Sequence, residues 1–75
     1  MANENHAEMR DEFWKLPPEA LVDRATVAAV RYVSIATVAG EAIKGVGPQY
    51  TLIGNRALYR KADVLAWIES MSRVV

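Results

Sequence analysis

The chain has 75 residues, of which nine are basic, nine are acidic and none is cysteine. This length gives one small domain, which buries only about 60–65% of its unfolded surface and has no room for a deep substrate cleft. Because the chain has no cysteine, disulfides, thiolate zinc sites and cysteine catalysis are excluded. No apolar run reaches the roughly 20 residues of a membrane span, and the polar start is unlike a signal peptide. We therefore expect a soluble cytoplasmic protein that acts without a membrane.

The charges are unevenly distributed along the chain. Residues 1–23 hold six acidic and two basic side chains, a net charge of −4, whereas residues 24–75 hold seven basic and three acidic side chains, a net charge of +4. A basic body with an acidic arm is typical of a DNA-binding protein. The alternative on this evidence is random scatter of charge over a neutral domain.

The first part of the chain, residues 1–18, is predicted to be an acidic arm that is partly disordered and ends at two prolines. Residues 1–12 are polar and show little periodicity, so we expect this stretch to be frayed. His6 is the only histidine, and without a cysteine in the chain it cannot complete a zinc site of three or four ligands. We therefore expect no metal and no cofactor.

Three apolar side chains interrupt this polar arm: Phe13, Trp14 and Leu16. They are costly to leave in water, so we expect them to dock on another surface. Two surfaces are open to them. One is a neighbouring copy of the protein, which would give head-to-tail self-association on DNA, and the other is the chain's own domain, residues 19–75.

Two helices joined by a short turn are predicted between Asp23 and Gly45. Asp23 and Ser34 are good N-caps, because their side-chain oxygens accept a hydrogen bond from a backbone N–H one turn later. Valines flank both caps at the positions of a hydrophobic staple, namely Val22 with Val27 and Val33 with Val38. Gly45 ends the second helix, since glycine adopts the left-handed conformation at little cost, and Pro48 prevents its resumption. The spacing is that of a helix-turn-helix.

A hairpin and a third helix follow. Residues 50–53 and 56–59 are β-type runs around Gly54-Asn55, a pair that supplies the positive φ of a two-residue loop. A helix begins near Ala62 and carries apolar residues at helical spacing, among which Trp67 is expected to anchor the core. The predicted fold class is mainly α with a small β-hairpin. It is a winged helix-turn-helix with three helices and a two-stranded wing.

Catalysis is not expected. The only base for a serine nucleophile is His6 in the arm, and the glycines lack the strand-to-helix context and the following lysine of a phosphate-binding loop. We expect that the protein is not an enzyme.

From Leu21 to Met71 the chain resembles the excisionase-type, MerR-like winged helix-turn-helix domains of phages, prophages and integrative elements. The matching residues are Ala28, Ser34, Thr37-Val38, Gly45, Pro48, Ile53-Gly54, Tyr59-Arg60, Asp63 and Ala66-Trp67. The family often has an arginine and an aromatic residue in the middle of the second helix, where this chain has Ala39-Gly40-Glu41.

The resemblance implies a recombination directionality factor, which binds repeated sites beside an attachment sequence, bends the DNA and biases a site-specific integrase toward excision of a mobile element. Two alternatives are a transcriptional regulator of the same fold and a protein-binding adaptor that has lost DNA contact.

The same reading assigns the residues that contact double-stranded DNA. The second helix is expected to enter the major groove by its N-terminal end. Four of its residues would face the base edges, namely Ser34, Ala36, Thr37 and Gly40, and Lys44 would lie near a phosphate. The hairpin tip, with Asn55 and Arg56, reaches the minor groove or the backbone, while Arg24 and Arg60 hold phosphates. We expect about four to six phosphate contacts.

Overall fold

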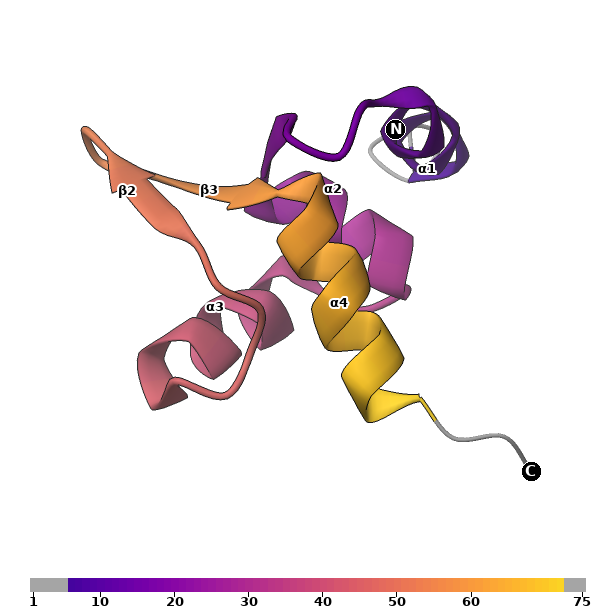
Figure 1. Ribbon diagram of the computed structural model, residues 1–75. Coiled ribbons are helices and arrows are strands. Elements are labelled where there is room, and N and C mark those ends of the chain that lie inside the picture. Colours follow the sequence, from indigo (N-terminus) through magenta and orange to yellow (C-terminus); the bar gives the residue numbers. More distant parts are fainter. Residues whose placement is uncertain (1–5, 73–75) are drawn as a thin grey trace.

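The computed structural model describes residues 6–72, which form four helices and one three-stranded antiparallel sheet (Figure 1). In chain order the elements are α1 (His6–Lys15), β1 (Leu21–Asp23), α2 (Arg24–Arg31), α3 (Ile35–Lys44), β2 (Thr51–Ile53), β3 (Arg56–Arg60) and α4 (Lys61–Met71). The prediction of a mainly α chain with a small β-hairpin is confirmed. The prediction of three helices and two strands was wrong, because α1 and β1 were not foreseen.

The predicted helix boundaries around α2 and α3 are confirmed by their caps. The carboxylate of Asp23 accepts from the Thr26 backbone N–H at 3.0 Å, and the Ser34 hydroxyl accepts from that of Thr37 at 3.1 Å. Gly45 closes α3 in the left-handed conformation, with φ of 73°. These local interactions fix where both helices begin and where the second one ends.

The turn between α2 and α3 has an unusual residue. Tyr32 ends α2 with φ of 60°, a left-handed conformation that is uncommon for a bulky side chain. Its exposed ring lies beneath the Arg10 guanidinium, 4.2 Å from the ring centroid, and Arg10 also donates to the Ala29 carbonyl at 3.0 Å. The strained turn is therefore also an attachment point for α1.

The predicted disorder of the arm was wrong for residues 6–12, which belong to α1; residues 1–5 lie outside the described residues. Phe13 projects from α1 into the body and is 0% exposed, and Leu16 packs beside it. At the end of the helix, the buried Lys61 ammonium donates to the Trp14 carbonyl at 3.1 Å and to the Leu16 carbonyl at 2.6 Å. The arm is therefore part of the folded body.

The sheet has the order β1-β3-β2, so the two strands of the predicted hairpin are extended by a strand that precedes α2. Tyr59 is paired with Val22 and both are buried, whereas Arg56, Leu58 and Arg60 alternate onto the other face. Every element except β2 contributes a side chain to the hydrophobic core: Phe13, Val22, Val27, Ala28, Val30, Val38, Tyr59 and Val64. The β2–β3 hairpin consequently projects beyond the core (Figure 1).

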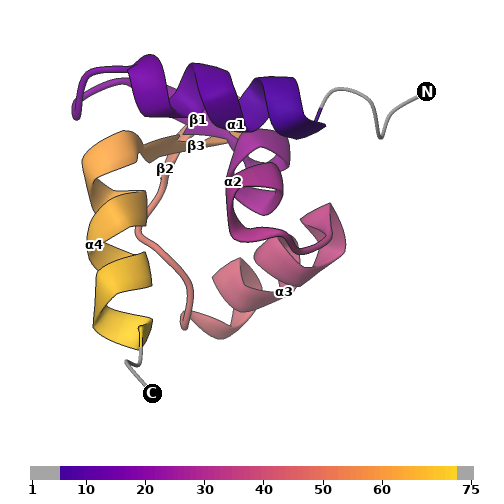
Figure 2. The same ribbon diagram turned by 90° about the vertical axis from the view of Figure 1, so that its right-hand side faces the viewer.

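The axes of α2 and α3 turn by 108° across the short break between them. Within residues 6–72, no single helix is long and apolar enough to cross a membrane, and only this bent pair reaches that length and apolarity when its two halves are combined. Figure 2 places α1 and α3 at opposite sides of the molecule, with α2 between them.

Candidate nucleic-acid interface

The surface of α3 that faces away from the body carries most of the residues expected to contact base edges. Val38 is 1% exposed and fixes the inner face of the helix. On the outer side, Ala36, Thr37 and Lys44 are exposed, and Gly40 has open space around the position of a side chain. The structure therefore brings these four residues to one accessible side of a single helix.

Ser34 and Thr37 have less freedom to read bases than the sequence suggested. The Ser34 hydroxyl already caps α3, and it lies 2.9 Å from the Thr37 hydroxyl. Both side chains are exposed at the start of the helix. Their mutual hydrogen bond satisfies part of their hydrogen-bonding capacity inside the chain, so less of that capacity remains for an external group.

The roll of α3 about its own axis is fixed by an ion pair with α2. Arg31 donates two hydrogen bonds to the Glu41 carboxylate, at 2.6 and 2.9 Å. The hydrogen bond from Arg31 holds the pKa of Glu41 below its ordinary value. Because a two-point arginine–carboxylate pair has a defined geometry, it prevents rotation of α3 against α2. Glu41, in the middle of the expected recognition helix, therefore has a structural partner.

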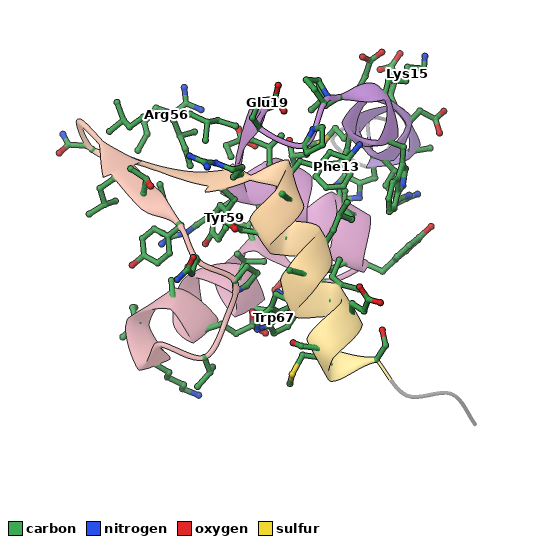
Figure 3. The ribbon with its side chains drawn as sticks, in the orientation of Figure 1. Phe13, Lys15, Glu19, Arg56, Tyr59 and Trp67 are labelled. Atoms are coloured by element: carbon green, nitrogen blue, oxygen red, sulfur yellow. The ribbon has the colours of Figure 1, made fainter. Side chains whose placement is uncertain are left out.

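Trp67 completes this brace, and its prediction as a core anchor was wrong. The indole is partly exposed, lies beneath the Arg31 guanidinium at 4.2 Å, and donates to the Val46 carbonyl at 3.0 Å. Figure 3 shows Trp67 between α4 and α3. It ties α4 to the segment that leaves α3, and the sequence signal for this role was only the aromatic residue at helical spacing.

Arg24 is a positioned cation. Its Nε donates to the Tyr59 hydroxyl at 3.1 Å, and its guanidinium lies 5.1 Å from the centroid of the Tyr50 ring. The hydrogen bond to Tyr59 raises the pKa of Arg24, so the charge is secure. Tyr50 is a second, weaker hydrogen-bond partner of the guanidinium. A guanidinium has five N–H donors, so those that the two tyrosines do not use are available to an external anion.

The hairpin tip is formed as predicted, with Gly54 at φ of 62° and Asn55 exposed beside it. Arg56 and Tyr59 lie on opposite faces of β3 (Figure 3). Arg56 has no acidic neighbour nearby in the sequence, but the sheet brings Asp23 to it: Arg56 Nη2 lies 3.4 Å from Asp23 Oδ2. Arg56 is thus a largely exposed cation with one weak internal partner, whereas Arg60 is exposed at the far end of the same face.

The three arm residues expected to mediate self-association do not form one surface. Phe13 and Leu16 are taken up by the chain's own body, which corrects their assignment to a neighbouring copy. Trp14 remains 57% exposed and packs edge-on against Phe13, with ring centroids 5.3 Å apart. Of the three, Trp14 offers the most exposed apolar area to a neighbour, since Leu16 is partly buried and Phe13 fully buried.

Sequence reasoning missed Ile43, which is 87% exposed on α3 next to Lys44. The missed signal was its spacing, since Ile43 falls seven residues after Ala36 and three after Gly40, on the same side of a helix.

Comparison with known proteins gives no further guide to the site: no protein-family model matches the chain, and no curated protein matches it.

Proposed function

We propose that the protein is a winged helix-turn-helix that binds double-stranded DNA, with α3 in the major groove and the β2–β3 hairpin as the wing. The observation that carries this proposal is the arrangement of α2 and α3, whose axes differ by 108°. This arrangement leaves the outer side of α3 exposed, next to a projecting hairpin (Figure 1). Helix-turn-helix proteins join their helices at about 90–120° through a turn of this length.

Within residues 6–72, four cations are available to phosphates in this arrangement: Arg24, Lys44, Arg56 and Arg60. Two others from the basic part of the chain are engaged internally, since Arg31 pairs with Glu41 and Lys61 is buried against α1. The number of phosphate contacts is therefore about four, the lower end of the expectation from the sequence. Helix α1, which carries Glu8, Asp11 and Glu12, lies on the opposite side of the molecule from α3 (Figure 2), so these charges are distant from a duplex bound at α3.

Within this class, we favour an excisionase-type recombination directionality factor that bends DNA near an attachment site. Few side chains on the outer side of α3 can donate hydrogen bonds to bases, so specificity must depend strongly on DNA shape and deformability, as in an architectural protein. A site-specific integrase would be its protein partner, and the cytoplasm its compartment. A transcriptional regulator of the same fold is the second candidate.

The test is a titration of purified protein against duplex DNA at increasing salt. With about four phosphate contacts, log affinity should fall against log salt with a slope of about −3 to −4. The variant Arg24→Gln should reduce the slope by about one, while Lys15→Gln, which removes an exposed cation of α1 on the opposite side from α3, serves as a matched control and should not. An affinity that is unchanged by salt, or no retardation at low salt, would reject DNA binding and favour a protein-binding adaptor.

DNA bending separates the architectural role from simple promoter binding. In a circular-permutation gel assay, a bending protein gives a mobility that depends on where the site lies in the fragment. Equal mobility at all positions, with binding intact, would leave the regulator as the better assignment.

A further inference from the structure

The outer side of α3 carries a stripe without hydrogen-bonding side chains. Ala36, Gly40 and Ile43 are spaced by four and three residues, so they lie along one side of the helix, roughly opposite the buried Val38. Ile43 is 87% exposed, more than any other large hydrophobic side chain among the described residues. A helix in a small domain normally turns such a side chain toward the core.

Nothing in the part of the chain that the structure describes accounts for this stripe. A side chain at Gly40 would meet no atom within 4 Å, and the backbone there does not require glycine. The ion pair between Arg31 and Glu41 fixes the roll of α3, so Ile43 cannot reach the core by rotation of the helix. The stripe is therefore suited to a surface outside the protein that approaches the helix closely and offers apolar groups.

We propose that this stripe recognises the C5-methyl groups of thymines in the major groove, with Ile43 as the principal contact. The inference rests on the proposed function, in which α3 enters that groove. The thymine methyl is the apolar group that the major-groove edges of the bases present, and aliphatic side chains contact it. Glycine at position 40 lets the duplex approach, and Lys44 beside Ile43 supplies a cation for the adjoining phosphate.

This assignment differs from hydrogen-bonded readout in its measurable consequences. Removing a methyl from the DNA should weaken binding by about fourfold for each thymine in contact, while the number of phosphate contacts stays the same. The slope of log affinity against log salt should therefore be equal for methylated and unmethylated DNA. The loss of affinity on removal of the thymine methyl groups should disappear when Ile43 is replaced by a smaller side chain.

The experiment compares two alternating A·T duplexes of about 20 base pairs, which are identical except that one carries deoxyuridine in place of every thymidine. Full-length protein should bind the thymine duplex about threefold to tenfold more tightly at the same salt concentration. In the reverse arm, replacing cytosine by 5-methylcytosine in a mixed G·C duplex should raise its affinity. This second arm adds a C5-methyl group to the major groove of a G·C pair, so it tests the effect of the methyl group independently of the A·T sequence.

The variant Ile43→Ala should bind the thymine and uracil duplexes equally, with circular dichroism showing an unchanged melting curve. Met71→Ala, which removes a similarly exposed apolar side chain at the end of α4, should retain the thymine preference. Equal binding of both duplexes by the unmodified protein, or an equal loss by Ile43→Ala on both, would overturn methyl recognition while leaving DNA binding intact. Failure to bind either duplex at low salt would instead reject the proposed function together with this inference.

Discussion

Asp23 on β1 and Arg56 on the adjacent strand β3 form an ion pair, with Arg56 Nη2 3.4 Å from Asp23 Oδ2, although they are 33 positions apart in the chain. The two oxygens of Asp23 have different partners: Oδ1 caps α2 through the Thr26 backbone N–H, and Oδ2 lies near the Arg56 guanidinium. The carboxylate therefore competes with any phosphate for a cation of the hairpin. A residue that begins a helix also moderates the charge beside the proposed DNA surface.

Replacing Asp23 by asparagine should separate these two roles. Asparagine caps a helix about as well as aspartate, so stability should change by less than about 1 kcal/mol. Removal of the negative charge frees Arg56, and DNA affinity should rise severalfold in a fluorescence anisotropy titration. Arg56→Ala is the matched opposite change and should weaken binding by about 1–3 kcal/mol with the fold intact. If Arg56→Ala lost affinity only in step with its melting temperature, the hairpin cation would be structural.

Gly40→Ala should stabilise the protein and weaken DNA binding. Glycine inside a helix costs about 0.5–1 kcal/mol relative to alanine, and the site has free space for the methyl group. The added methyl group would lie on the side of α3 that is proposed to approach the duplex. Thermal unfolding and anisotropy, measured on the same preparations, should therefore move in opposite directions. A stabilised variant with unchanged affinity would place Gly40 outside the DNA contact.

The ion pair between Arg31 and Glu41 should make stability depend on pH in the acid range. Since the folded state lowers the pKa of Glu41 below its ordinary value of 4.5, the contribution of this carboxylate is complete above that value. It is lost as the pH falls through the lower, folded pKa. The difference in melting temperature between the natural protein and Glu41→Gln should accordingly be constant near neutrality and narrow below pH 4.5. A constant difference down to strongly acid pH would show that the pair does not titrate with folding.

The neighbouring aromatics of α1 should have separable effects. Phe13→Ala removes a fully buried ring and should destabilise the fold by about 3–5 kcal/mol, whereas Trp14→Ala should have a small effect because its indole is 57% exposed. If copies associate head to tail on DNA, Trp14→Ala should preserve affinity for one site and reduce cooperativity on two or three sites in a gel. Unchanged cooperativity would exclude Trp14 from any contact between copies.

The parts of the fold that the sequence predicted are those with local causes. The caps at Asp23 and Ser34 and the left-handed Gly45 act within one helical turn, and all three were predicted correctly. In contrast, α1 has a polar sequence, and a helix of ten residues is marginal in isolation. Its position depends on Phe13 in the core and on Lys61 at its end, two contacts that only the folded chain brings together.

The candidate site was predicted unevenly for the same reason. The sequence placed Lys44 and the small residues on the second helix, because helical spacing is a local property. It did not reveal that Arg24 is held by Tyr59, that Glu41 is committed to Arg31, or that Asp23 lies beside Arg56. These pairings join residues from different elements. These pairings decide how many cationic side chains remain available to an external anion, and a count of basic residues in the sequence overestimates that number.

The placement of β1 also has a consequence for how the chain folds. β1 ends immediately before α2, and its partner β3 begins only after α3 and β2, so the β1–β3 pairing closes a loop that contains the two helices of the proposed helix-turn-helix. Closure of such a loop carries an entropic cost that must be met before the pairing is formed. During synthesis β1 stays unpaired until residues 56–60 have left the ribosome. Once closed, the sheet joins the two ends of the helical segment, so the hairpin is connected to α2 through the β1–β3 pairing as well as through the intervening chain.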